Sequence, residues 1–186
     1  AGLPGHSMAG YGSWPIAMKY SELYSSFYAM SSCCLSPYSA DGGGLAEAAK
    51  VATLEDAAQA QIFTRVNLTL AAAWSPDPAK PPPYFDFPVE NGQVRPLVLA
   101  KWAANVPLAM IDQYVPQLRT FEAIGIEVGT QDGLIGDNQR ISDVLTSYGI
   151  QHIYETYDGD HTNKVAERYE TRVLPFFSRE LEFRQP

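Results

Sequence analysis

The chain has 186 residues, a net charge of −8 at pH 7 and 46% hydrophobic residues. This length and composition suit a globular chain with a sizeable core, and the negative charge argues against nucleic acid as a partner. Because no apolar run is as long as a membrane span, we expect no membrane partner either.

The first motif along the chain is Gly5-His6-Ser7-Met8-Ala9-Gly10. It matches the G-x-S-x-G pattern of a nucleophile elbow, except that Ala9 takes the place of the last glycine. In an elbow a serine lies on a sharp turn between a strand and a helix, with its hydroxyl exposed and small residues around it. Ser7 is therefore the candidate nucleophile, and we expect the side chain of His6 to point away from its site.

The elbow lies unusually early, because only Ala1 to Pro4 precede it. In a complete α/β-hydrolase about half of the sheet comes before this motif, together with a loop that donates one oxyanion N–H. We therefore expect the chain to correspond to the C-terminal half of such a hydrolase, with its N-terminal strands absent. An uncovered sheet edge predicts a homo-oligomer or a complementary N-terminal fragment as partner, and the cellular compartment stays open.

The elements that follow are predicted from apolar periodicity and from the placement of proline and glycine. We expect helices at 8–23 (kinked at Pro15, or restarted with Ser13 as its cap), 45–73, 97–118 (broken at Pro107 and Pro116), 137–148 and 164–181; strands at 27–35, 123–129 and 152–157; and irregular chain at 36–44 and 74–96.

This order of strands and helices predicts an α/β fold with a parallel sheet and flanking helices. Residues 1–40 and 119–186 would form the hydrolase core, and 41–118 an inserted cap that is helical and irregular. Aromatic residues of this cap are candidates for substrate binding, although they could equally form the cap's own small core: Trp74, Tyr84, Phe85, Phe87 and Trp102.

Two adjacent cysteines, Cys33 and Cys34, follow an apolar run. A disulfide between neighbouring residues is strained, so we expect two reduced, buried thiols. The histidines are scattered and no spacing of metal ligands occurs, and we therefore expect no metal and no cofactor.

A serine nucleophile needs a base to take its proton and a carboxylate to orient that base. In α/β-hydrolases the chain order is Ser, Asp or Glu, then His. Asp132 follows the strand predicted at 123–129, and His161 follows the last predicted strand. Since the carboxyl ends of parallel strands lie at one edge of the sheet, both could meet Ser7 there.

Other residues compete for these roles. Asp137 is a second candidate for the acid, but its place before Asn138 is typical of a helix cap. Glu127 lies within a predicted strand and is interpreted as structural. His152 begins a strand and is interpreted as a polar boundary residue.

The chain resembles the "Putative esterase" family of α/β-hydrolases, which includes feruloyl esterases and is related to the mycolyltransferases. The matching motifs are G-H-S-M-A-G-Y-G at 5–12, G-T-Q-D-G-L-I-G-D-N at 129–138 and G-D-H-T-N at 159–163. The resemblance implies a triad of Ser7, Asp132 and His161. It also implies that the N–H of Met8 contributes to an oxyanion hole.

These observations predict a serine carboxylic-ester hydrolase that forms an acyl-enzyme with a small-molecule ester. Two alternatives stay open. One is a non-catalytic hydrolase fragment that acts as a binding module, and the other is an acyltransferase.

Overall fold

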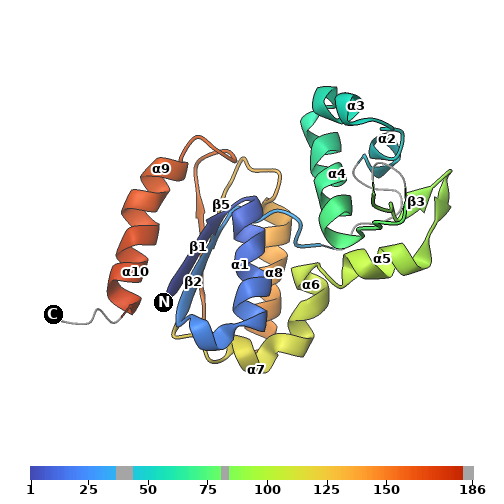
Figure 1. The fold of residues 1–186 in the computed structure, drawn as a ribbon. Coiled ribbons are helices and arrows are strands. Elements are labelled where there is room, and N and C mark those ends of the chain that lie inside the picture. The colour runs from blue at the N-terminus through green and yellow to red at the C-terminus, as the bar shows by residue number, and fades with distance from the viewer. Residues whose placement is uncertain (37–43, 81–83, 182–186) are drawn as a thin grey trace. The chain divides into compact units, whose positions relative to one another are not determined.

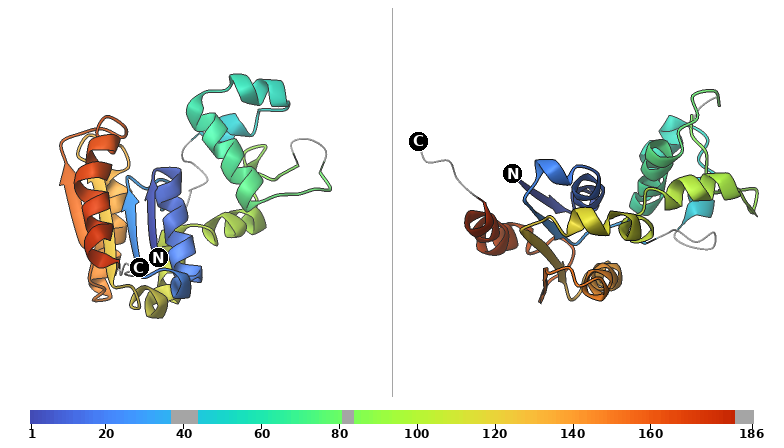
Figure 2. Two further views of the ribbon diagram at one scale, coloured as in Figure 1. Left: turned by 60° about the vertical axis from the view of Figure 1, so that its left-hand side comes forward. Right: turned by 90° about the horizontal axis from the view of Figure 1, so that it is seen from below.

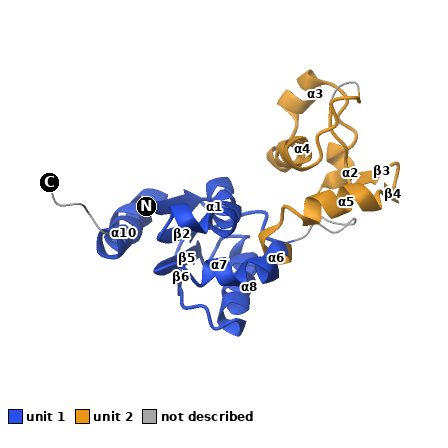
Figure 3. Ribbon diagram, turned by 60° about the horizontal axis from the view of Figure 1, so that its bottom comes forward, with its two compact units in different colours: residues 1–36, 110–186 blue, residues 37–109 orange. Residues whose placement is uncertain are grey.

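The computed structural model describes residues 1–36, 44–80 and 84–181. The chain divides into two compact units, of which unit 1 comprises residues 1–36 and 110–186, and unit 2 residues 37–109 (Figure 3). Residues 110–118, assigned above to the inserted cap, belong to unit 1, whereas 37–40, assigned above to the core, lie outside the described residues. The irregular segment predicted at 36–44 lies outside the described residues from 37 to 43.

Unit 1 is built on a parallel sheet, as the order of elements predicts. Within the described residues its four strands lie in the order β1-β2-β5-β6, and each pair of neighbours is parallel. The strands are β1 (Gly2–His6), β2 (Ser26–Met30), β5 (Ala123–Gly129) and β6 (Ile153–Tyr157). The two strands that carry the elbow and the late histidine, β1 and β6, therefore lie at opposite edges of this sheet.

Helices cover both faces of the sheet. Figure 1 and the right-hand view of Figure 2 show α1 and α8 on one face and α10 on the other. The helical elements of unit 1 are α1 (Met8–Lys19), η1 (Ser21–Leu23), η2 (Ile111–Tyr114), α7 (Val115–Leu118), α8 (Ile135–Ser147), α9 (Val165–Arg168), the π-helical η3 (Tyr169–Val173) and α10 (Leu174–Glu180), while α6 (Pro107–Met110) spans the division between the units.

Neighbouring residues of β2 show how the core is shared between the two faces. Phe27 packs edge-on against Trp14 of α1, with ring centroids 4.9 Å apart. Tyr28 packs edge-on against Phe176 of α10, at 5.0 Å. Since successive side chains of a strand point to opposite faces, helices on both faces explain why every residue of β2 is buried.

The strand predicted at 27–35 is shorter in the structure, because the extended backbone ends at Met30. Ser31 and Cys34 have positive φ angles, 42° and 58°, so the chain turns repeatedly after the strand. Residues 31–35 are mostly buried although they do not form a strand, so a buried segment was interpreted as part of the strand. Cys33 and Cys34 form no disulfide, and their sulfur atoms lie 2.9 Å apart; Cys34 is buried and Cys33 half-buried.

Helix α1 passes through Pro15 without a restart. Ser13, considered above as the cap of a restarted helix, instead donates its hydroxyl to the carbonyl of Ala9 one turn earlier, at 2.9 Å. The closing helix predicted at 164–181 is present but changes to π-helical geometry in the middle.

Unit 2 contains short helices and a hairpin. The helix predicted at 45–73 is wrong as a single element, because Thr53 caps a new helix by accepting a hydrogen bond from the N–H of Asp56. The elements are α2 (Leu45–Ala48), α3 (Leu54–Gln59), α4 (Ile62–Trp74), β3 (Val89–Glu90), β4 (Gln93–Val94) and α5 (Pro96–Ala103). Among the described residues, no helix is long and apolar enough to cross a membrane.

Candidate active site

The turn between β1 and α1 has the geometry that the elbow motif predicts. Ser7 has φ 57° and ψ −116°, a strained conformation for a residue with a side chain. A Cβ at Gly5 would overlap the carbonyl of Ala9, and a Cβ at Gly10 would lie 2.7 Å from Ser32 Oγ. Ala9 itself is exposed, which explains how its methyl group fits where the motif usually has glycine.

Main-chain hydrogen bonds fix this turn in place. The N–H of Ser7 donates to the carbonyl of Met30 at the end of β2, at 3.0 Å. The carbonyl of Ser7 accepts from the N–H of Tyr11 at 2.8 Å and from that of Cys33 at 3.3 Å. Met8 is the first residue of α1, so its N–H belongs to the first turn, where N–H groups have no acceptor within the helix.

Asp132 lies on the turn that follows β5. Its N–H donates to the carbonyl of Gly129 at 3.1 Å, and its Oδ1 accepts from the N–H of Leu134 at 2.9 Å. The residue is buried. These bonds hold one carboxylate oxygen in the turn and leave the other, Oδ2, directed at His161.

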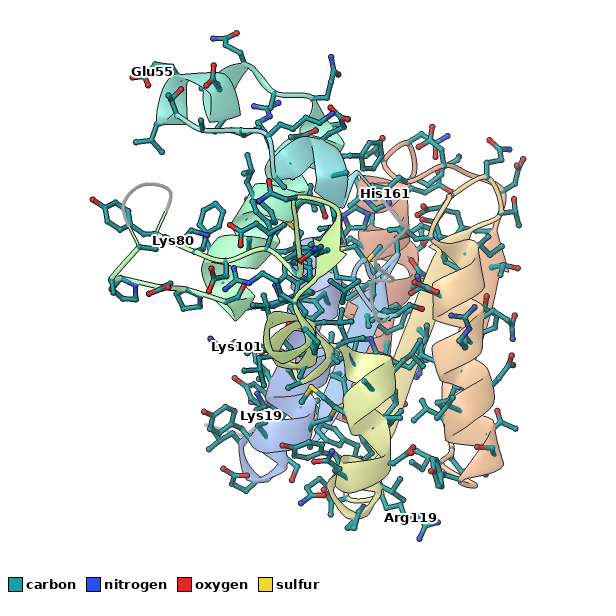
Figure 4. The ribbon with its side chains drawn as sticks, turned by 90° about the vertical axis from the view of Figure 1, so that its right-hand side faces the viewer. Lys19, Glu55, Lys80, Lys101, Arg119 and His161 are labelled. Carbon is teal, nitrogen blue, oxygen red and sulfur yellow. The ribbon has the colours of Figure 1, made fainter. Side chains whose placement is uncertain are left out.

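His161 connects the other two side chains. Its Nδ1 lies 2.8 Å from Oδ2 of Asp132, and its Nε2 lies 2.9 Å from Oγ of Ser7. The imidazole is partly exposed, with 36% of its surface accessible, whereas the carboxyl group of Asp132 is 2% exposed. Figure 4 labels His161 at the end of unit 1 opposite Arg119, which lies just before β5.

The loop that carries His161 is fastened to the turn after β5. The N–H of Gln131 donates to the carbonyl of Gly159 at 3.0 Å, and the side chain of Gln131 donates to Asp158 at 2.7 Å. A Cβ at Gly129 would overlap the carbonyl of Gly159, so the loop crosses the end of β5 in direct contact with it.

The arrangement has a definite chemical capability. With a proton on Nδ1 donated to Asp132, the Nε2 of His161 is free to accept the proton of the Ser7 hydroxyl. A buried carboxylate next to the imidazole stabilises the positive charge that this transfer would create. Three residues that are distant in the sequence are thus brought together at the carboxyl ends of the strands.

The competing carboxylates lie elsewhere. Asp137 accepts hydrogen bonds from Ser36 and Arg140. It is not the cap of α8, because that position is taken by Leu134 and Asp137 lies in the first turn. The cap interpretation was therefore wrong.

Glu127 is buried in β5, where it accepts hydrogen bonds from Tyr28 and from Arg168 at 2.9 and 2.8 Å. This pairing ties α9 to the sheet, which agrees with a structural role. His152 lies just before β6 and contacts Ser142 Oγ at 2.7 Å.

The prediction for His6 was wrong, because its side chain points toward His161 and not away from the site. Its Nε2 lies 2.8 Å from the carbonyl oxygen of His161, and the two rings are 4.9 Å apart. The missed signal is its position, one residue before Ser7 at the carboxyl end of β1.

The aromatic residues of the inserted segment pack against one another within unit 2. Trp74 and Trp102 meet edge-on at 5.2 Å, and Phe85 and Phe87 at 5.4 Å. All four are less than 10% exposed, whereas Tyr84 is 54% exposed. This packing favours a small core of unit 2 over an open substrate pocket.

No group of three or more His, Cys, Asp or Glu side chains suited to a metal ion occurs among the described residues.

The model of the family described as "Putative esterase" matches residues 1–165. The chain belongs to this family. The matched range includes Ser7, Asp132 and His161 and spans unit 2. A comparison with curated protein sequences found no match.

Solved structures of α/β-hydrolase-fold enzymes share the fold of this esterase-family chain. A ferulic acid esterase has a TM-score of 0.54 at 18% identity, covering 96% of this chain and 50% of its own. The S-formylglutathione hydrolase FrmB from Staphylococcus aureus has a TM-score of 0.53 at 16% identity, covering 94% of this chain and 49% of its own. For FphF, a fluorophosphonate-binding serine hydrolase from S. aureus, the values are 0.54, 15%, 94% and 52%. The chain thus spans about half of the length of these enzymes.

Proposed function

We propose that the protein is a serine carboxylic-ester hydrolase in which Ser7, His161 and Asp132 act as the catalytic triad. The observation that carries the proposal is the pair of hydrogen-bond distances at His161, 2.9 Å to Ser7 Oγ and 2.8 Å to Asp132 Oδ2. Membership of the esterase family and the fold shared with serine hydrolases support it.

In the proposed acylation step, Ser7 Oγ attacks the ester carbonyl carbon while His161 Nε2 takes the hydroxyl proton. The carbonyl π-electrons move to oxygen, and the N–H of Met8 donates a hydrogen bond to that oxyanion. When the tetrahedral intermediate collapses, the bond to the alcohol oxygen breaks and His161 returns its proton to the leaving alcohol. Ser7 then carries the acyl group.

Deacylation repeats these steps with water. His161 takes a proton from a water molecule while the water oxygen attacks the acyl carbon. The proton then passes to Ser7 Oγ as the bond between Oγ and the acyl carbon breaks and the acid leaves. Asp132 holds the imidazole in the tautomer that both steps need and stabilises its positive form. The substrate class is therefore a small-molecule carboxylic ester, and no cofactor takes part in the proposed steps.

We further propose that the β1 edge of the sheet binds a macromolecular partner. In the described sheet β1 is an edge strand, and such an edge is a template for pairing with further strands. A homo-oligomer or a complementary N-terminal fragment of hydrolase sequence would provide that pairing, and light scattering after size exclusion would detect either.

Hydrolysis of short-chain p-nitrophenyl esters tests the proposal. We expect turnover by the wild type and a loss of several orders of magnitude in Ser7→Ala with the fold retained. Adding a competing alcohol distinguishes the two reaction types, because an acyltransferase would yield the new ester in place of the free acid. Equal turnover by Ser7→Ala would contradict the proposal, as would binding of esters without any turnover.

A further inference from the structure

His161 must reach across most of the sheet to meet Ser7. Its loop follows β6, whereas Ser7 follows β1, and β2 and β5 lie between these strands. Three strand spacings amount to about 14 Å. The near end of the loop is fastened at Gln131, as described above, and the far end, where His161 lies, needs its own point of attachment.

The side chain of His6 provides this attachment. Its Nε2 lies 2.8 Å from the main-chain carbonyl oxygen of His161. Adjacent residues of the elbow therefore bind the same histidine twice, because Ser7 contacts its side chain and His6 contacts its main chain. Within the same loop, Asp160 accepts hydrogen bonds from the N–H groups of Thr162 and Asn163, and these bonds close residues 160–163 into a turn.

The bond shows which ring nitrogen of His6 carries a proton. A carbonyl oxygen only accepts, so Nε2 must carry the proton. Burial lowers the pKa of His6 below its ordinary value and outweighs the hydrogen bond to the His161 carbonyl, which raises it; the charge of a protonated His161 lowers the pKa further, whereas Asp132 and Glu127 raise it. A neutral His6 suits the site, since a positive imidazole there would oppose the charge that forms on His161 during catalysis.

We propose that His6 is a positioning residue: its Nε2–H holds the main chain of His161 so that the imidazole stays in line between Ser7 and Asp132. The inference rests on the proposed function, because it assigns His6 to the same reaction. It does not require His6 to touch the substrate.

The matched substitutions are His6→Gln and His6→Asn. Glutamine can place an amide N–H about as far from the backbone as Nε2, whereas the amide of asparagine is one methylene too short. We expect His6→Asn to lower kcat by about 10- to 100-fold with KM within about threefold of wild type, because small displacements of catalytic groups carry costs of this size. His6→Gln should recover most of the loss. The control is His152→Gln, because His152 contacts Ser142 and not His161.

A spectroscopic measurement keeps the inference separate from the proposed function. In protein with ¹⁵N-labelled histidine, the Nδ1 proton of His161 should exchange with water faster in His6→Asn than in wild type and in His6→Gln. This result in a protein without esterase activity would support the positioning role and reject the proposed function.

Two outcomes would overturn the inference in an active enzyme. The first is a kcat of His6→Asn within about threefold of wild type. The second is an equal loss in His6→Gln and His6→Asn that follows a lower melting temperature in both, since a structural role alone predicts this. Unchanged exchange of the His161 proton in His6→Asn would overturn it whether or not the enzyme is active.

Discussion

Asp132 Oδ2 and His161 Nδ1 lie 2.8 Å apart, although each residue follows a different strand of the sheet. The carboxyl group is buried and its second oxygen is held by the N–H of Leu134. The carboxylate therefore has one orientation available, and that orientation determines which tautomer of His161 is favoured.

Replacing this carboxylate should affect turnover far more than replacing its neighbour. Asp132→Asn keeps the size of the side chain but favours the wrong imidazole tautomer, so we expect kcat to fall by about 10³-fold or more. Asp137→Asn, which changes only contacts with Ser36 and Arg140, should stay within about tenfold of wild type. Ester hydrolysis by the two purified variants makes the comparison, and the reverse ranking would assign the acid to Asp137.

The elbow should not tolerate a methyl group at Gly5. Because the Cβ would overlap the carbonyl of Ala9, Gly5→Ala should destabilise the protein by about 1–3 kcal/mol and reduce turnover. Gly12→Ala is the matched control in α1, since nothing lies within 4 Å of its Cβ. We expect it to raise stability by up to about 1 kcal/mol through helix propensity. Urea unfolding measures both, and equal stabilities of the two variants would contradict the packing described for the elbow.

Trp102 should matter for the stability of unit 2. It is fully buried, packs edge-on against Trp74, and donates its indole N–H to Ser75 at 2.8 Å. Trp102→Ala should therefore cost about 3–5 kcal/mol, whereas Tyr84→Ala, at a side chain 54% exposed, should cost less than about 0.5 kcal/mol.

Calorimetry measures these stabilities, and relative rates on acetyl and aryl esters test the alternative role of the aromatic residues. A changed substrate preference in Trp102→Ala with unchanged stability would indicate a pocket in place of a core.

Much of unit 1 was predictable because its elements have clear apolar periods. The strand 123–129 is found with the predicted bounds. Asp132, which follows it, contacts His161 after β6, and His161 contacts Ser7. The failures have physical reasons. Residues 31–35 are mostly buried but turn after Met30, so burial alone does not define a strand. The helix predicted at 45–73 is interrupted where Thr53 caps a new helix. The position of His6 beside Ser7 placed it near the site, but its contact with His161 depends on how the loop after β6 crosses the sheet, which that position alone does not determine.

Unit 2 should lose stability at low pH through Asp86. Burial alone would raise the pKa of Asp86, but hydrogen bonds from Arg95 and Lys80 outweigh it and hold the pKa below its ordinary value. A lowered folded-state pKa gives stability that is complete above the unfolded pKa and lost as the pH falls through the folded one. Asp86→Asn should therefore destabilise unit 2 by about 2 kcal/mol at pH 7.

The difference between wild type and Asp86→Asn should shrink as the pH falls below the ordinary aspartate pKa, as protonation removes the charge from the wild-type side chain as well. Thermal unfolding followed from pH 7 into the acid range measures it. A difference that stayed constant with pH would exclude this charge as its source.

Covalent labelling of Ser7 measures whether its hydroxyl is activated by His161 across the 2.9 Å contact. The protein is treated with a fluorophosphonate probe, digested, and the modified residue is located by mass spectrometry. We expect a single adduct on Ser7, none in Ser7→Ala, and labelling slowed by about 100-fold or more in His161→Gln. A folded protein that leaves Ser7 unmodified, or labelling of Ser7 at the same rate without His161, would contradict this activation.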